Sequence, residues 1–221
     1  MRAAYVFFLL VVVVAVLVWS GIGCHDTPTW LLEVAPAVVG CIVLVLTWRR
    51  FPLTPLLYTL IAIHMIILAV GGHYTYALVP AGDWVKDWLH LSRNHYDRLG
   101  HLAQGFVPAI IAREIFMRLG VVERHGWRNF LIVSVCMAIS ALYELIEWTV
   151  ALILREASDS FLGTQGDVWD TQVDMFLALV GACSAILLLW HWHDRQLVRL
   201  NHWMIARNLR ADALPGHAVK G

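Results

Sequence analysis

The chain is dominated by long apolar segments, each about the length of a helix that crosses a lipid bilayer. Such a helix needs about 20 residues. Six stretches of this kind cover residues 5–20, 30–48, 53–70, 99–118, 130–154 and 173–192. Backbone groups in lipid must bond within their own segment, which favours helices. The sequence therefore predicts an all-α fold, a polytopic membrane helix bundle with six transmembrane helices.

The composition agrees with a membrane protein and excludes other classes. Hydrophobic residues make up 60% of the 221 residues and charged residues 14%, whereas about a quarter of a soluble domain is charged. Several of the 11 Trp stand near the ends of apolar segments, as in membrane-interface belts. The formal net charge of +0 supplies no basic field for nucleic acid. We therefore expect membrane lipids, and not nucleic acid, as partners.

The first apolar segment has two interpretations. It follows the basic residue Arg2 and precedes Gly21 and Cys24, a pattern that fits a cleaved signal peptide. A lipoprotein processing site, however, usually has Leu three residues before the cysteine, where this chain has Gly21. We favour a retained first helix.

A polar connection of residues 80–96 separates the third and fourth segments. Within it Trp84, Trp88 and Leu89 keep helical spacing against charged neighbours. This pattern predicts a short interfacial helix, lying on the membrane surface between spans three and four.

The distribution of positive charge predicts the orientation. Cytoplasmic loops carry the excess of Lys and Arg. With six spans, only four of the 16 Lys and Arg fall on one side, namely Lys86, Arg93, Arg98 and Arg155. Both termini are therefore predicted to be cytoplasmic. Residues 1–198 would form the transmembrane domain and residues 199–221 a basic cytoplasmic tail.

Three polar motifs lie near the predicted outer ends of spans four, five and six. They are Asp97, His101 and Gln104; Glu144 and Glu147; and Asp167, Asp170 and Asp174. Members of each motif are three, four or seven residues apart, so each motif shares one helix face. Ionisable groups in a bundle face the interior or a wet cavity, because facing lipid is costly. We therefore predict one polar pocket that faces outward.

A divalent metal is a chemically simple occupant of such a pocket. Carboxylates this close cannot all stay ionised unless a cation joins them or some hold protons. Helical bundles build metal sites from carboxylates with one or two His. Oxygen-rich donors with one imidazole favour Mg, Mn or Fe, with Zn also open, while the lack of thiolate ligands argues against a structural Zn site. The predicted ligands are Asp97, His101, Glu144, Glu147, Asp170 and Asp174.

Two other interpretations of these acids stay open. The pocket can work without metal, as an acid–base site or a proton relay. Alternatively the acids only clamp the helices together, by pairing with Arg98, Tyr96, Tyr143 and their neighbours.

We expect most of the remaining polar residues to be structural. His64 stands alone in the middle of span three and is interpreted as a satisfied core histidine. Glu33 lies near the outer end of span two, where it snorkels or reaches the pocket. Near the cytoplasmic ends, four side chains are expected to snorkel; these are Arg113, Glu114, His191 and His193.

Small residues mark expected turns and helix contacts. Gly71 and Gly72 follow the third apolar segment and are interpreted as turn residues. Gly105 and Gly181 are expected to allow close approach of two helices.

Three blocks of the sequence resemble a known family. They read NHYDRLGHLAQGFVPAIIAREI, SALYELIEW and FLGTQGDVWDTQVDM. Together they are similar to the YjdF-type bacterial inner-membrane proteins, over most of residues 72–195. That family has no assigned activity, so the resemblance implies a setting in the bacterial inner membrane. The chain is more loosely similar to the VanZ-like superfamily, which implies a setting in the cell envelope. That resemblance marks Asp97, His101, Glu144, Asp170 and Asp174, while Glu147 departs from the usual Gln.

The first functional hypothesis is a membrane enzyme acting on a lipid or lipid-linked envelope molecule, because the acids lie at headgroup depth. Glu144 is predicted to act as base and His101 as acid, with Arg98 and Gln104 binding substrate.

The alternatives are a small proton- or cation-coupled transporter and a structural membrane protein. Transport is disfavoured because the sequence shows no repeats and no acid paired in the cytoplasmic half. A homodimer stays open as the source of a missing half.

Overall fold

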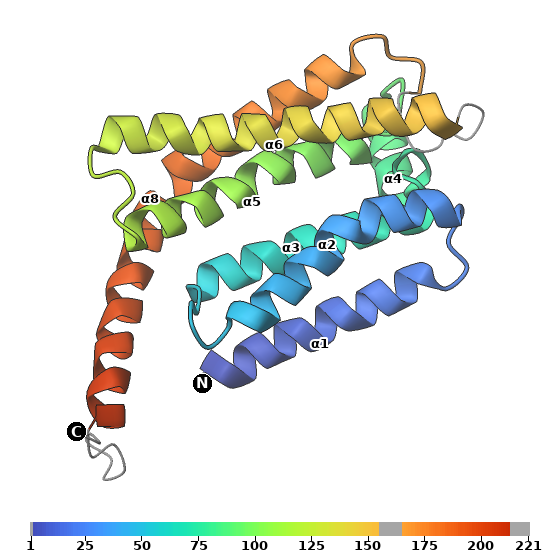
Figure 1. The fold of residues 1–221 in the computed structure, drawn as a ribbon. Helices are drawn as coiled ribbons and strands as arrows, with labels where there is room; N and C mark the ends of the chain where they lie inside the picture. Colours follow the sequence, from blue (N-terminus) through green and yellow to red (C-terminus); the bar gives the residue numbers. More distant parts are fainter. Residues whose placement is uncertain (1, 155–164, 213–221) are drawn as a thin grey trace.

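Every regular element in the part of the chain that the structure describes is a helix, as predicted (Figure 1). The computed structural model describes residues 2–154 and 165–212. Its elements are α1 (Arg2–Gly21), α2 (Thr27–Thr47), α3 (Pro55–Tyr74), the short 3-10 helix η1 (Tyr76–Leu78), α4 (Pro80–Leu89), α5 (Tyr96–Arg118), α6 (His125–Leu154) and α8 (Asp170–Asp212).

Among the described helices, five are long and apolar enough to cross a membrane: α1, α2, α3, α6 and α8. The predicted fourth span, α5, is not one of them, because charged residues such as Arg98, Arg113 and Glu114 lower its hydropathy. The count of six spans is therefore not confirmed by hydropathy alone. The predicted sixth span ends at residue 192, but α8 continues as one helix to Asp212; residues 213–221 of the predicted tail lie outside the described residues.

The long helices of the described residues fall into two groups (Figure 1). One group is α1, α2 and α3, and the other is α5, α6 and α8; contacts between α3 and α5 join them. The α5 helix packs against α3, α6 and α8, so its many polar side chains are covered by neighbours. The two ends of the described chain lie at the same end of the bundle, and α4 lies at the other end (Figure 1).

The first helix packs as a member of the bundle. The indole Nε1 of Trp30 donates to Ser20 Oγ at 2.9 Å. His73 Nδ1 lies 2.9 Å from the carbonyl oxygen of Ser20, and the rings of Trp19 and His73 stack. These contacts join the C-terminal end of α1 to α2 and α3.

Two N-caps begin helices where the sequence supplies the residues for them. Asp26 accepts from the backbone N–H of Thr29 at 2.9 Å and caps α2. Hydrogen bonding to Thr29 lowers the pKa of Asp26. Thr54 caps α3, and Pro55 occupies its first turn. Such caps accept hydrogen bonds from backbone N–H groups of the first turn, which have no partner within the helix.

Glycines bring α5 and α8 together, as the sequence predicts. A Cβ atom on Gly105 would collide with the carbonyl oxygen of Ala178, and one on Gly181 would collide with that of Leu102. The two backbones are thus in direct contact. The expectation of a turn at Gly71 and Gly72 was wrong: both lie inside α3. A side chain at position 71 would collide with the ring of Tyr76.

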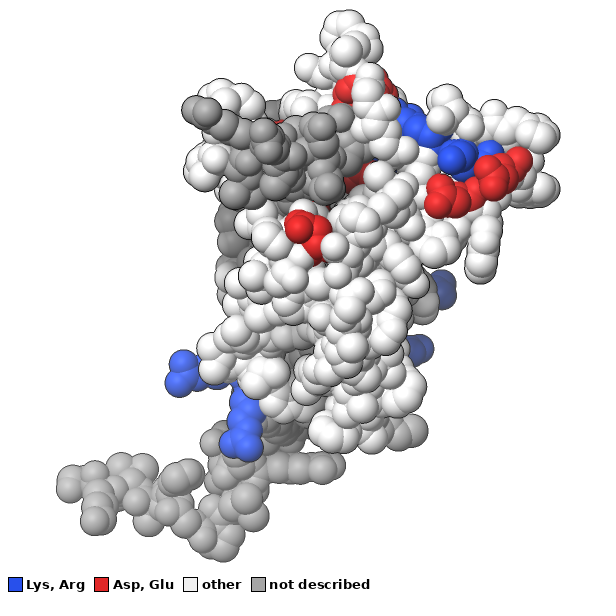
Figure 2. Space-filling view, turned by 90° about the vertical axis from the view of Figure 1, so that its right-hand side faces the viewer, with Lys and Arg blue, Asp and Glu red and all other residues white. Residues whose placement is uncertain are grey.

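The predicted interfacial helix is present as α4. Its Trp84 and Trp88 are strongly exposed. The amide of Asn94 donates to the Val79 carbonyl at 2.9 Å, and a Cβ on Gly82 would collide with that amide. Acidic and basic side chains lie side by side on this end of the molecule (Figure 2), as in the pair of Lys86 and Asp83. That α4 lies on a membrane surface stays a prediction.

Candidate functional site

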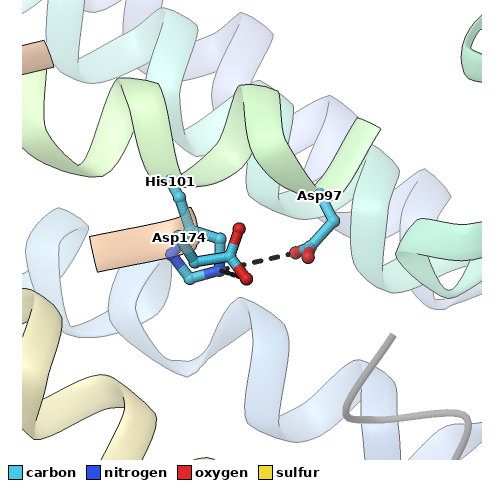
Figure 3. Close-up of side chains that lie close together, drawn as sticks. All are labelled: Asp97, His101 and Asp174. Carbon is cyan, nitrogen blue, oxygen red and sulfur yellow. Dashed lines mark ion pairs between the residues drawn. The ribbon is translucent and has the colours of Figure 1, made fainter. Parts of the chain in front are cut away.

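Three of the predicted site residues meet at His101. Figure 3 shows Asp97 and His101 on α5 and Asp174 reaching them from α8. His101 Nε2 lies 3.5 Å from Asp97 Oδ1 and 4.0 Å from Asp174 Oδ2. One ligand atom from each residue falls within 4.8 Å of the others, the spacing of a candidate metal site. All three residues are buried.

The other ring nitrogen of His101 faces two acceptors. Nδ1 lies 3.1 Å from Gln104 Oε1 and 3.8 Å from Glu144 Oε1. A nitrogen between two acceptor oxygens carries hydrogen, so Nδ1–H donates to Gln104. In the neutral ring, Nε2 would then hold a lone pair that points at two carboxylates. That arrangement is repulsive unless Nε2 binds a proton or a cation.

Two carboxylate oxygens beside His101 lack hydrogen-bond partners. They are Glu144 Oε1 and Asp174 Oδ1, in residues that are 8% and 3% exposed. Over the described residues, no donor reaches either atom. Because buried acceptors are almost always satisfied, each missing partner points to a further group at this position.

A cavity of about 280 Å³ opens on one side of His101. Glu147, Glu33 and Tyr143 line it with Asp97 and His101. The Tyr143 hydroxyl donates to Glu33 Oε2 at 3.0 Å and so links α6 to α2. Glu33 is therefore a member of the pocket, which the sequence left open.

His64 was expected to be a satisfied core histidine, and this is wrong. Its Nε2 atom is buried and has no hydrogen-bond partner among the residues that the structure describes. The residue lines the same cavity as His101, at a deeper level of α3. A single sequence cannot reveal this, because a lone histidine in an apolar helix looks the same with or without a partner.

Asp170 and Arg98 form ion pairs with residues of the connecting segments. Arg93 pairs with Asp170 and lies 3.4 Å from Asp167, and Arg98 lies 2.7 Å from Asp167. A hydrogen bond from the Trp169 N–H lowers the pKa of Asp167, and the two arginines lower it further. The sequence did not single out Arg93, whose place in a polar loop gives no sign of its burial.

A second polar cluster lies near the opposite ends of α5 and α8. Glu114 accepts from Thr54 Oγ1 at 2.8 Å, from Arg118 at 3.0 Å and from His193 Nε2 at 3.1 Å. Arg113 donates to His193 Nδ1 at 2.8 Å and to Asp194 at 2.7 Å. An arginine only donates, so His193 is neutral and carries its proton on Nε2.

The expectation of snorkelling side chains was therefore wrong for three of these residues. Glu114 and His193 are both 0% exposed, and Arg113 is buried as well. The related expectation that no acid is paired in this half was also wrong, since Glu114 pairs with Arg118. Packing against the Thr54 cap of α3, which the sequence pattern does not show, draws the side chains inward.

The structure thus separates the six predicted metal ligands into three groups. Asp97, His101 and Asp174 come together, with Glu144 beside His101. Glu147 lines the cavity, outside the group of three, and Asp170 pairs with Arg93. Of the two predicted substrate-binding residues, Gln104 lines the cavity and Arg98 pairs with Asp167.

Comparisons with known proteins agree with the predicted family. The chain is 55% identical over 184 residues to the inner membrane protein YjdF of Escherichia coli (strain K12), which covers 83% of this chain and 88% of that protein. No solved structure matches the chain of this protein. The family model described as "predicted membrane protein (DUF2238)" matches residues 5–195. The chain therefore belongs to this DUF2238 family of membrane proteins, to which its YjdF-type motifs had assigned it.

Proposed function

We propose that the chain crosses the bacterial inner membrane six times, with both termini in the cytoplasm. The α5 helix would be the additional span. Its neighbours α3, α6 and α8 pack around it. Polar side chains that these helices cover do not face lipid, so they do not prevent α5 from crossing the membrane. The common end of the two termini and the excess of Lys and Arg expected there support this orientation. The His101 pocket would then open toward the outer leaflet.

We infer that Asp97, His101 and Asp174 hold a divalent cation. The observation that carries this proposal is that His101 Nε2 faces two carboxylates while Glu144 Oε1 and Asp174 Oδ1 lack partners. Two ligand atoms that share a metal at about 2.0–2.2 Å lie at most about 4.4 Å apart. The 3.5 and 4.0 Å distances to Nε2 meet this limit.

The surroundings of His101 also suit a metal ligand. A ligating histidine usually donates its other ring N–H to a carbonyl or carboxylate, which fixes the ring. Gln104 Oε1 supplies that acceptor at 3.1 Å. Oxygen donors with one imidazole suit Mg, Mn, Fe or Zn.

The site would serve an enzyme that acts on a lipid or lipid-linked envelope molecule. A bound cation would supply a Lewis acid that polarises an ester or amide carbonyl. Glu144, beside His101 and with one oxygen unpartnered, is placed to act as general base. In a metal-free site His101 would itself be the acid. The cavity supports substrate access because it reaches His101 from the helix surface.

Metal content tests this proposal directly. Protein purified in a neutral maltoside detergent is expected to hold about one divalent metal per chain by elemental analysis. Asp97→Asn and Asp174→Asn should each lose it. Glu123→Gln changes an exposed acid between α5 and α6 and should keep it. Metal-free wild type that also takes up no added Mn²⁺, or equal metal in all four proteins, would refute the cation site.

A cation-coupled transporter is the second candidate, favoured by one observation. His64 extends the polar lining of the cavity deeper along α3, with its Nε2 unpartnered. Cation flux into proteoliposomes that is lost in both His64→Leu and Asp97→Asn would favour transport. Flux equal to that of empty liposomes would dismiss it.

A further inference from the structure

We propose that the cavity beside His101 binds the ammonium head group of a single-chain amphiphile. This inference rests on the proposed function, because it names the substrate class of the same site. It concerns the cavity that Glu33, Tyr76, Tyr143 and Glu147 line beside Asp97 and His101. It follows from the acidic residues, the aromatic rings, the apolar part and the size of this space.

The described lining of the cavity gathers three acidic side chains and contains no Lys or Arg. The three acids are Glu33, Asp97 and Glu147. The nearest outer arginines are engaged elsewhere, since Arg98 pairs with Asp167 and Arg93 with Asp170. A phosphate or carboxylate head group would meet these acids and neither Lys nor Arg among the described lining residues. A cationic head group would be attracted by the acids.

Aromatic rings stand beside these acids. Tyr76 and Tyr143 both line the cavity. The Tyr76 ring rests on Gly71 and Gly100, where added side chains would displace it. Tyrosine faces attract ammonium groups, and rings combined with acids form the cages that recognise them. The ring and acid together therefore favour an ammonium group over a bare metal ion beside these residues.

The deeper part of the cavity is apolar and reaches the lipid-facing surface. Leu68, Pro36 and Pro108 line it, with Ile139 and Leu142 of α6. The side chains of Ile139 and Leu142 are partly exposed at the outside of the helix. A hydrocarbon chain can therefore leave between α2 and α6, below the Tyr143–Glu33 hydrogen bond that joins these helices.

His64 indicates that the deeper part also takes a ligand. Its buried Nε2 faces no partner among the described residues, although it lines the cavity. A polar group on the first carbons of an amphiphile, such as a hydroxyl or an amide, would satisfy it. The volume of about 280 Å³ lies just below the usual range for small-ligand pockets, about 300–1,000 Å³. It suits a head group and the first methylenes of one chain.

Three probes with the same chain separate the head groups: tetradecylammonium, tetradecyl phosphate and tetradecanol. Binding to the full-length protein in maltoside micelles is measured by native mass spectrometry. We expect tetradecylammonium to bind at least tenfold more tightly than the other two. Glu33→Gln and Glu147→Gln should each remove most of this preference. The amide oxygen that Glu33→Gln introduces can still accept from Tyr143, so the link between α6 and α2 is kept. Glu123→Gln is the matched control and should behave as wild type.

Equal binding of the three probes, a preference for the phosphate, or unchanged preference in both Glu variants would overturn the inference. The same preparations are analysed for metal. A normal metal content without ammonium preference refutes this inference and leaves the proposed cation site standing. A preference for ammonium in protein that holds no metal supports this inference and refutes the proposed cation site. Asp174→Asn, whose side chain does not line the cavity, should lose metal and keep the ammonium preference.

Discussion

Two polar clusters lie on the same pair of helices and differ in how far they are satisfied. In the orientation that we propose, the cluster around Glu114 and His193 is the inner cluster, and the cluster around His101 is the outer cluster. They are about 20 Å apart along α5. In the inner cluster Glu114 and Asp194 face Arg118 and Arg113 across a neutral His193. The outer cluster gathers acids around one imidazole and leaves two of their oxygens without partners among the described residues.

The difference teaches how to distinguish a structural cluster from a functional one. Breaking a buried, fully bonded ion pair is strongly destabilising, so the inner cluster fixes α3, α5 and α8 to one another. Buried oxygens without partners cost free energy, and a fold retains such strain mainly where a ligand relieves it. We therefore assign a structural role to the inner cluster and propose a guest for the outer one.

The largest effect is expected from Glu114→Ala. The change leaves the buried His193 without its acceptor and removes the carboxylate that pairs with Arg118, and breaking a buried pair costs about 3–5 kcal/mol. Thermal unfolding followed by tryptophan fluorescence in maltoside measures it, with Glu123→Ala as the exposed control. A loss of stability no larger than that of the control would mean that the inner cluster does not stabilise the fold.

Gly105→Val should have the next largest effect, because it separates α5 from α8. The new side chain would meet the Ala178 carbonyl, and such overpacking costs about 1–3 kcal/mol. Since Asp97 and His101 share α5 while Asp174 is on α8, metal content should fall as well. Normal metal content in a folded, destabilised variant would show that the site does not depend on this contact.

Asp174→Asn should separate function from stability. Removing one negative charge from the outer cluster relieves repulsion, so we expect the melting temperature of the metal-free protein to stay the same or rise. Metal content should be lost. This combination is typical of residues kept for function at a cost in stability. A melting temperature as low as that of Glu114→Ala would instead make the outer cluster a second structural clamp.

The smallest effect on stability is expected from Asp167→Asn, which removes the partly exposed ion pair with Arg98. The Trp169 N–H and the arginines lower the folded-state pKa of Asp167. The ionised carboxylate therefore adds to the free energy of unfolding above its unfolded pKa, about 3.9. This stabilisation is lost as the pH falls through the folded-state pKa. Wild type should therefore melt slightly higher than the variant at neutral pH, and the difference should vanish in acid. A difference that grows on acidification would contradict this sign.

The sequence predicted much of the outer cluster, because its residues repeat at helical spacing inside apolar segments of known length. Helix order then brought Asp97, His101 and Asp174 to one level, and Gly105 predicted the close contact that joins them. The inner cluster was missed, since Glu114 and His193 have the same sequence surroundings whether they snorkel or pair. Only packing against Thr54 decides between these outcomes. The burial of Arg93 and the unpartnered nitrogen of His64 likewise depend on neighbours distant in sequence.

The most direct test of this account is the response of thermal stability to added Mn²⁺. A ligand that binds only the folded state raises the melting temperature. The account predicts a rise for wild type after metal removal, no rise for Asp174→Asn, and a rise from a lower baseline for Glu114→Gln, whose outer cluster is intact. No rise in wild type, or an equal rise in all three proteins, would contradict it.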